Sequence, residues 1–365
     1  MASSTAQESQ ELARSRQGED GKMIQSSTLG IINKDDLPMM IKAVVQDAWG
    51  TPDVLQIETI PRPQPKPGEV VIRMRAASLN QGDWHLMMGE PYLIRCVGFG
   101  FSKPKNRIPG QYLAGEVVAR GDGVVALELG DHVFGTCKQA FAEYVCVAAQ
   151  NLAPMPTNLN FEEAASVPHG GFSAIQALRD AGKLKAGQNV LVIGAAGAVG
   201  SMAVQIAKSM GAEVTGVCRA TQMEQVRALG ADVILDYEVD DFSADGERYH
   251  LILDMVHDRP NSHYRRALFS GGKSIMVGGG QGQWLGGMGG VLFAAFTSLF
   301  SKKKLVPFLA IPKTDDLHAL SAMIENGVIR PPVDRTFPLA QTADAFRYLE
   351  SKITAGMIAL TSTRS

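Results

Sequence analysis

The chain has 365 residues, of which 45% are hydrophobic and 20% charged, and its formal net charge is −2. This length suits two domains or one large one, and the near-neutral charge gives no reason to expect nucleic acid or an anionic membrane as a partner. The four cysteines form no Cys-x-x-Cys pair, so a reducing, cytoplasmic setting is the simpler prediction.

Residues 1–40 are mostly polar and include the acids Glu8, Glu11, Glu19 and Asp20. A secretory signal would need an apolar core, and a mitochondrial presequence would be poor in acids. We therefore expect a mostly disordered extension over residues 1–40.

The remaining chain changes its hydrophobic rhythm twice. Residues 41–165 contain short apolar runs such as "GEVVIRMRAASLN" and "FAEYVCVAAQ" between Pro- and Gly-rich turns, which is typical of a β-rich domain. Residues 166–313 alternate helical patterns with apolar runs, which predicts a parallel sheet with crossover helices. Residues 314–365 carry two further helical patterns, "DLHALSAMIENG" and "ADAFRYLESKI". The strands expected in the parallel sheet are 190–193, 214–218, 233–235, 251–253 and 274–277.

A glycine-rich turn follows the apolar run at 190–193 and precedes an amphipathic helical pattern. Compared with G-x-G-x-x-G, Ala195 occupies the first glycine position, and Gly197 and Gly200 occupy the second and third. The N–H groups at the start of the helix would bind the phosphates of a dinucleotide. Close packing of helix on sheet, the alternative, would also select glycine. The residues expected to bind the cofactor here are Gly194, Ala195, Ala196, Gly197, Ala198, Val199 and Gly200.

The end of the next strand, "VCRATQ", indicates which dinucleotide binds. Sites for NAD usually have Asp or Glu there to bind the ribose 2′-hydroxyl. This chain has Arg219 and no acid, so NADPH is expected in preference to NADH. The alternative is a solvated surface arginine.

The segment Gly289–Lys304 is the one other stretch that could suggest a membrane. Its apolar part, Val291–Phe300, is about half the ~20 residues that span a bilayer. A buried or substrate-covering helix is favoured over an interfacial anchor, and no spanning segment is expected.

Taken together, several motifs resemble the medium-chain dehydrogenase/reductase superfamily, in particular its zinc-free quinone oxidoreductase branch. They include "ASLNQGDWHLMMGEPY", "IPGQYLAGEVVARG", "EEAASVP", "GAAGAVGSMAVQIAKSMGAEVTGV" and "GGKSIMVGG". The resemblance implies an α/β protein with a GroES-like β-barrel catalytic domain at 41–165. A Rossmann domain, a doubly wound parallel sheet that binds NADP, would follow at 166–313, with a return to the catalytic domain at 314–365. The family also implies a homodimer.

The resemblance implies that zinc is absent. Asn80 stands where zinc alcohol dehydrogenases have a cysteine ligand, and Gly110-Gln111-Tyr112 stands near their Gly-His-Glu motif. Zinc sites are built from thiolate, imidazole or carboxylate ligands. Without a Lewis acid, the expected substrates are those already activated by conjugation, namely quinones and enones. The small residues of "GGGQGQWLGGMGGVLFAAF" suggest a bulky, apolar one.

Catalytic candidates follow from the same resemblance. Asn80 and Asp83 match an N-x-x-D motif, although they could instead cap a turn. His85 or Tyr92 could donate a proton or a hydrogen bond, although His85 could be an ordinary loop residue. On the cofactor side, Tyr237 could equally be a core tyrosine. The residues that match cofactor-facing positions are Ser173, Tyr237, Gly278 and Gly279.

Four positions depart from the family pattern: Tyr112 and His169 in the first half, Met255 and His257 in the second. By the family's fold, His169 and His257 would lie near the cleft between the two domains and could form a specialised acid/base site. The prediction is an NADPH-dependent, zinc-free oxidoreductase that transfers hydride to a quinone or an activated C=C bond. One rival is a non-redox or specialised biosynthetic enzyme that uses His85, His169 and His257 as acid/base groups. Another is a nucleotide-binding regulatory protein with little turnover.

Overall fold

The computed structural model describes residues 37–278 and 301–362. The extension expected at 1–40 lies almost entirely outside these ranges, as do Gly279 and most of the Gly289–Lys304 segment. Leu37 is already buried, and the first strand begins at Met40. No helix in the described ranges combines the length and hydropathy that a membrane span requires.

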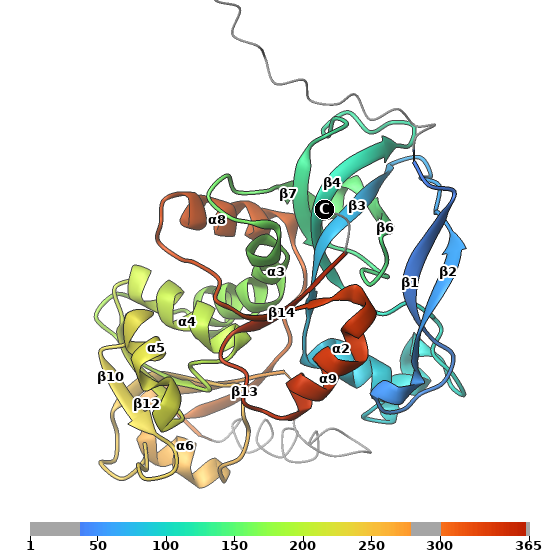
Figure 1. Cartoon of the computed structure of the whole chain (residues 1–365). Coiled ribbons are helices and arrows are strands. Elements are labelled where there is room, and N and C mark those ends of the chain that lie inside the picture. Colours follow the sequence, from blue (N-terminus) through green and yellow to red (C-terminus); the bar gives the residue numbers. More distant parts are fainter. Residues whose placement is uncertain (1–36, 279–300, 363–365) are drawn as a thin grey trace, which may run out of the picture.

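One half of the molecule is a β-rich unit built from both ends of the chain (Figure 1). Strands β1 (Met40–Gln46) and β2 (Leu55–Pro61) pair with each other. A seven-stranded sheet follows the order β14-β15-β3-β4-β5-β7, and β6 pairs with β3. Because β15 pairs antiparallel with β3, the C-terminal segment completes a sheet that begins near the N-terminus. The strands of this sheet are β3 (Glu69–Leu79), β4 (Tyr112–Arg120), β5 (His132–Thr136), β6 (Tyr144–Ala148), β7 (Leu152–Pro154), β14 (Val333–Pro338) and β15 (Met357–Thr361).

The other half is a six-stranded sheet in which every strand pairing is parallel. All five strands expected between residues 190 and 277 are present, so the predicted parallel sheet is confirmed. In the order β10-β9-β8-β11-β12-β13, the chain adds β9 and β10 on one side of β8 and then continues with β11 on its other side. Dinucleotides bind outside the carboxyl ends of the strands where the order changes side in this way. The strands are β8 (Asn189–Ile193), β9 (Glu213–Cys218), β10 (Val233–Asp236), β11 (Tyr249–Asp254), β12 (Leu268–Val277) and β13 (Lys304–Phe308).

Helix α4 covers the parallel sheet with the apolar face that the sequence predicts. Its residues Met202, Ala203, Ile206 and Ala207 are almost completely buried. Both helical patterns in the last fifty residues also form helices, α8 and α9. The α-helices are α2 (Gln81–Met88), α3 (Phe161–Gln176), α4 (Ala198–Ser209), α5 (Met223–Ala228), α6 (Asn261–Ala267), α8 (Thr314–Glu325) and α9 (Thr342–Glu350). Shorter 3-10 or π turns occur at Pro52–Val54, Arg95–Phe99, Ala149–Asn151, Ala177–Gly182, Ala220–Gln222 and Leu339–Gln341.

Helix α3 joins the two halves and spans the boundary expected between residues 165 and 166. It packs against α4 on one side and against β3 and β4 on the other. A capping box starts it, in which Asn160 Oδ1 accepts from Glu163 N and Glu163 Oε2 accepts from Asn160 N. Gly170 lets α3 approach α4 closely, since a Cβ at this position would lie 2.5 Å from Ala198 O.

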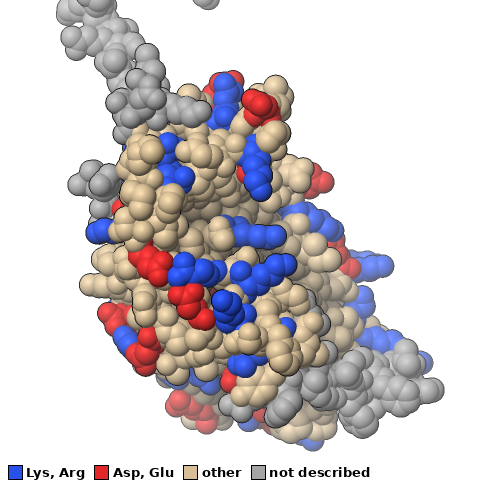
Figure 2. All heavy atoms as spheres, turned by 90° about the vertical axis from the view of Figure 1, so that its right-hand side faces the viewer, with Lys and Arg blue, Asp and Glu red and all other residues tan. Residues whose placement is uncertain are grey.

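The face that carries β1 and β2 shows Lys and Arg side chains among Asp and Glu side chains (Figure 2). Arg107, for example, pairs with both Asp47 and Glu58. Charges of both signs therefore lie close together on this surface, where exposed ion pairs contribute little to stability.

Candidate cofactor and substrate site

The glycine-rich turn connects β8 directly to α4 at the carboxyl edge of the parallel sheet. Gly194 has a φ of 84°, in the left-handed region that favours glycine. The N–H groups of Gly194 and Ala195 both donate to Val217 O, at 3.0 and 2.9 Å. A Cβ on Gly200 would lie 2.1 Å from Gly194 O, whereas one on Gly197 would meet only that oxygen, at 3.4 Å. Gly200 is thus required for packing, and Gly197 leaves room beside the turn.

The start of α4 fits a phosphate group. Gly197 is the N-cap residue, and no side chain caps the helix there. The first N–H groups of a helix have no partner within it, and they carry partial positive charge. Ala198, Val199 and Gly200 therefore present donors to a pyrophosphate, which is what the predicted phosphate-binding turn requires.

Arg219 and Tyr237, predicted separately as cofactor residues, lie together beyond β9 and β10. Arg219 Nε donates to the Tyr237 hydroxyl at 3.0 Å. Within the described ranges, Arg219 forms no ion pair with a carboxylate. Arg259, which the sequence analysis did not single out, donates from Nη2 to Tyr237 O at 3.1 Å. It comes from the loop after β11, so no local sequence pattern could have linked it to Tyr237.

The turn after β11 is organised by a fully buried carboxylate. Asp254 Oδ1 accepts from the N–H groups of Val256 and His257, and its Oδ2 accepts from the Tyr264 hydroxyl at 2.7 Å. This turn touches the phosphate-binding turn, because a Cβ on Gly194 would lie 3.2 Å from Val256 Cγ2. The carboxylate therefore positions backbone that borders the expected cofactor site.

His257 occupies this turn with a φ of 59°, an uncommon value for a side chain of its size. Its Nδ1 lies 3.2 Å from Asp254 Oδ2, and its Nε2 lies 3.1 Å from Val277 O. Burial lowers the pKa of His257, but the Asp254 carboxylate raises it by a larger amount, so the net shift is upward. Both ring nitrogens face protein oxygens, so the side chain links the ends of β11 and β12. A catalytic role for His257 stays a prediction.

Gly278 directly follows β12, and its φ is 89°. Its N–H donates to Phe308 O at 3.2 Å, and a Cβ there would meet no atom of the described residues within 4 Å. Gly278 lies at the carboxyl edge, close to the strand end that His257 contacts.

In the β-rich half, Asn80 and Asp83 form the N-terminal cap of α2. Asn80 Oδ1 accepts from Gly82 N and Asp83 N, while Asp83 Oδ2 accepts from Asn80 N at 3.1 Å and Asn80 Nδ2 at 2.6 Å. Gln111 Nε2 donates to Asp83 Oδ1 at 3.3 Å. Burial raises the pKa of Asp83 to about 7 despite these hydrogen bonds. Both side chains act in the cap, and their catalytic role remains a prediction.

His85 and Tyr92 lie on α2 and in the segment that follows it. His85 Nδ1 lies 2.9 Å from Glu90 O, and burial lowers the pKa of the imidazole. The guanidinium carbon of Arg95 lies 4.6 Å from the centroid of the Tyr92 ring. These contacts hold both rings near the C-terminal end of α2.

His169 and Ser173 lie one turn apart on α3 and are partly exposed in a helix that is otherwise largely buried. The His169 ring centroid lies 5.7 Å from that of Tyr112, the first residue of β4. Burial lowers the pKa of His169 to about 4, and it raises that of Tyr112. Because the neighbouring Gly170 packs on Ala198, these two residues lie beside the start of α4.

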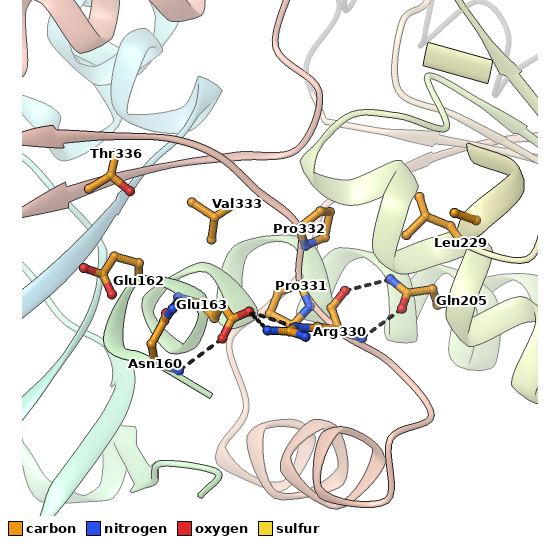
Figure 3. Close-up of a pocket in the computed structure, with 11 residues that line it drawn as sticks. Asn160, Glu162, Glu163, Gln205, Leu229, Arg330, Pro331, Pro332, Val333 and Thr336 are labelled. Atoms are coloured by element: carbon orange, nitrogen blue, oxygen red, sulfur yellow. Dashed lines mark hydrogen bonds and ion pairs between the residues drawn. The ribbon is translucent and has the colours of Figure 1, made fainter. Parts of the chain in front are cut away.

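A surface pocket of about 640 Å³ lies elsewhere, between α3, α4 and the segment before β14 (Figure 3). Its polar groups bind one another. Arg330 Nε donates to Glu163 Oε1 at 2.8 Å, and Gln205 exchanges two hydrogen bonds with the Arg330 backbone. None of the predicted site residues lines this pocket.

The donor set does not fit a zinc ion. Asn80 and Gln111, at the positions where zinc relatives were expected to have ligands, carry amides that are used in the α2 cap. Across residues 37–278 and 301–362, no group of three or more His, Cys, Asp or Glu side chains could hold a metal. We derive no catalytic step from zinc.

Comparison with known proteins gives matches over both halves. Residues 66–157 match the family described as "Alcohol dehydrogenase GroES-like domain", and residues 229–360 match "Zinc-binding dehydrogenase". The β-rich half is therefore a GroES-like domain, and the parallel sheet forms the Rossmann domain, as predicted.

Individual relatives agree with these matches. The chain is 32% identical over 303 residues to the "Chloroplast envelope quinone oxidoreductase homolog" of Arabidopsis thaliana, covering 79% of this chain and 88% of that protein. It is 28% identical over 348 residues to the "NADPH-dependent alkenal/one oxidoreductase, chloroplastic" of the same species, with coverage of 91% and 82%. The solved structure of the quinone oxidoreductase from Coxiella burnetii superposes with a TM-score of 0.77 and 25% identity, covering 88% of this chain and 99% of that one.

The two glycines of the turn should respond differently to substitution. We expect Gly200→Ala to destabilise the fold by roughly 1–3 kcal/mol, because the new Cβ would overlap Gly194 O. Gly197→Ala should change stability by less and should weaken NADPH binding instead. Urea denaturation and fluorescence titration of each variant measure the two effects, and equal losses of stability would contradict this assignment.

The Asp254–His257 pair should make stability depend on pH. A histidine whose folded pKa is raised stabilises fully below its unfolded pKa of about 6.5 and loses this contribution as pH rises through the folded value. The pKa of Asp254 is lowered, so this carboxylate stays ionised above about pH 5. We expect the difference in free energy of unfolding between wild type and His257→Asn, measured from pH 5.5 to 9, to shrink as pH rises. Asn tolerates a positive φ, so parallel curves would show that the pair contributes nothing.

Proposed function

The chain belongs to the medium-chain dehydrogenase/reductase superfamily, in its quinone oxidoreductase-like branch, and on that premise we propose an NADPH-dependent reductase of quinones or enones. Its membership makes it an oxidoreductase, and the glycine turn at the carboxyl edge of the parallel sheet supports binding of a nucleotide there. The observation that carries the proposal is the uncapped start of α4 together with the Arg219–Tyr237 pair.

The preference for NADPH rests on Arg219. No acid stands at the end of β9, the position at which one would repel a 2′-phosphate. Arg219 Nε donates to the Tyr237 hydroxyl, so the two terminal nitrogens of the guanidinium group are left to donate paired hydrogen bonds to that phosphate. The name of the alkenal/one oxidoreductase relative, which specifies NADPH, supports the same choice.

When bound, the cofactor supplies a hydride, so that it is oxidised by two electrons while the quinone or the activated C=C bond is reduced. The chain's own contribution is to hold the phosphates at Gly194–Gly200 and the adenosine end at Arg219 and Tyr237. The Gly278 and Gly279 turn and Ser173 would border the nicotinamide end. His85, Tyr92 or water would donate the proton that completes the reduction, and Asn80 and Asp83 would support that segment.

The reaction we propose needs no zinc. Conjugated substrates are electrophilic without a Lewis acid. The amide donors at Asn80 and Gln111 support this choice, since amides are poor zinc ligands.

The contacts of His257 favour the redox function over the non-redox rival. That rival uses His85, His169 and His257 as acid/base groups, whereas the ring nitrogens of His257 lie 3.2 Å from Asp254 Oδ2 and 3.1 Å from Val277 O. A purely regulatory nucleotide-binding protein would need neither the open α3 face nor the partly exposed histidine on it.

We further propose that the protein acts in the cytoplasm on a bulky apolar molecule.

We also propose that it forms a homodimer. Strand β13 is the outer strand of the parallel sheet, and Leu309 and Ile311, which follow it, are 81% and 66% exposed. Pairing of such an edge with a second copy would cover both side chains.

The cofactor assignment can be tested by titrating the protein with NADPH and NADH while following nicotinamide fluorescence. We expect tighter binding of NADPH, and we expect Arg219→Ala to weaken it by roughly tenfold or more because a charged hydrogen bond is lost, with little change for NADH. Arg227→Ala, which removes an exposed arginine of α5, is the matched control.

Equal binding of the two cofactors by wild type would contradict the NADPH preference. Binding of neither would overturn the proposed function. Consumption of NADPH only when a quinone or enone is added would support it.

A further inference from the structure

Helix α3 faces the junction of the two domains through two positions. His169 and Ser173 are partly exposed, whereas the residues from Glu163 to Pro168 and from Gly170 to Phe172 are buried. Positions i and i+4 share one face of a helix, so both side chains open in the same direction. The helix thus presents an imidazole and a hydroxyl to one region.

Tyr112 approaches this face from the GroES-like domain. It is the first residue of β4 and is partly exposed, and its ring is tilted by 48° to that of His169 at a centroid distance of 5.7 Å. The two rings come from different domains, so only the folded protein brings them together. His169 directly precedes Gly170, which packs on Ala198 O at the start of α4.

Within the described residues, the polar atoms of both rings are without hydrogen-bond partners. Among residues 37–278 and 301–362, the Tyr112 hydroxyl and the two His169 nitrogens make no hydrogen bond to another residue. This distinguishes them from Asn80 and Asp83, whose polar atoms are engaged by hydrogen bonds in the α2 cap. Partly buried polar groups without protein partners at the edge of a binding region are available to a ligand.

Both rings are uncharged near pH 7. Burial lowers the pKa of His169 to about 4, and burial together with the neighbouring Asp83 raises that of Tyr112. A neutral phenol donates through O–H, and a neutral imidazole donates through one N–H. Two neutral donors in a partly desolvated site suit an oxygen atom that gains negative charge during a reaction.

We propose that Tyr112 and His169 together bind the carbonyl oxygen of the substrate. This inference rests on the function proposed above and identifies where that oxygen lies. Hydride from the reduced cofactor forms a C–H bond at the β-carbon of an enone, and the C=C electron pair moves toward the carbonyl oxygen as an enolate. The two donors stabilise that oxygen, and a proton from water or a neighbouring donor then forms the C–H bond at the α-carbon, which restores C=O.

The first test compares turnover of an enone by variants that remove one donor each. Tyr112→Phe keeps the ring and loses only the hydroxyl, and His169→Leu loses the imidazole, whereas His169→Gln keeps an N–H donor. Loss of one donor to a developing oxyanion should lower kcat by roughly 10²-fold, with the Kd of NADPH unchanged and partial rescue in His169→Gln. Matched controls are Tyr348→Phe, whose hydroxyl binds Asp334, and His318→Gln on the exposed face of α8.

The second test needs no turnover. 4-Nitrophenol, whose anion absorbs near 400 nm, is titrated into wild type and each variant, with and without NADP⁺, as a probe for an oxyanion site. We expect wild type to bind the phenolate form in preference to the phenol, and we expect Tyr112→Phe and His169→Leu to lose this preference. Both controls should retain it.

The outcomes separate the two proposals. Wild type that reduces enones with NADPH, while Tyr112→Phe and His169→Leu stay within twofold of it, would overturn the donor pair and leave the proposed function intact. Wild type that neither binds NADPH nor consumes it would overturn the proposed function. In that case, a wild-type preference for phenolate that both variants lose would still support an oxyanion site. Absence of this preference in wild type would overturn the oxyanion site as well.

Discussion

The close approach of α3 to the first turn of α4 is the constraint on which the site depends. Gly170 of α3 lies against Ala198 O, and Gly200 of α4 lies against Gly194 O, so any side chain at either position would push the elements apart. Since α3 also packs on β3 and β4, this contact joins the two domains. It places the open face of α3 beside the uncapped helix start that suits a phosphate.

Two buried carboxylates organise the backbone on either side of this contact. Asp83 completes the α2 cap in the GroES-like domain, and Asp254 holds the turn after β11 in the Rossmann domain. Their environments differ. Burial raises the pKa of Asp83, whereas at Asp254 the effect of burial is outweighed by His257 and the backbone donors, which keep its pKa low. Each carboxylate thereby fixes a segment at the cofactor or substrate side without having to react itself.

Local sequence patterns predicted the strands of the parallel sheet and the helix after the glycine turn. Each strand is an apolar run, and helix α4 is a regular repeat of apolar positions that become buried. The glycine turn and Arg219 were singled out as cofactor candidates from their place after a strand, and that role stays a prediction. The roles of single side chains were harder to predict from the sequence. His257 resembled a free acid/base group in the sequence, but Asp254 and Val277 engage its ring, and the second contact comes from another strand.

By itself the sequence determined the two fold types, the order of strand and helix around the nucleotide turn, and the absence of an acid after β9, since these depend on neighbours along the chain. Only the tertiary structure decided which polar atoms remain available. Tyr112 and His169 are 57 positions apart, yet their rings meet, and Arg259 reaches Tyr237 from a different loop. Whether a polar group is satisfied depends on atoms that arrive from distant parts of the chain, and their arrival is set by how glycine and small residues allow α3, α4 and the barrel to pack.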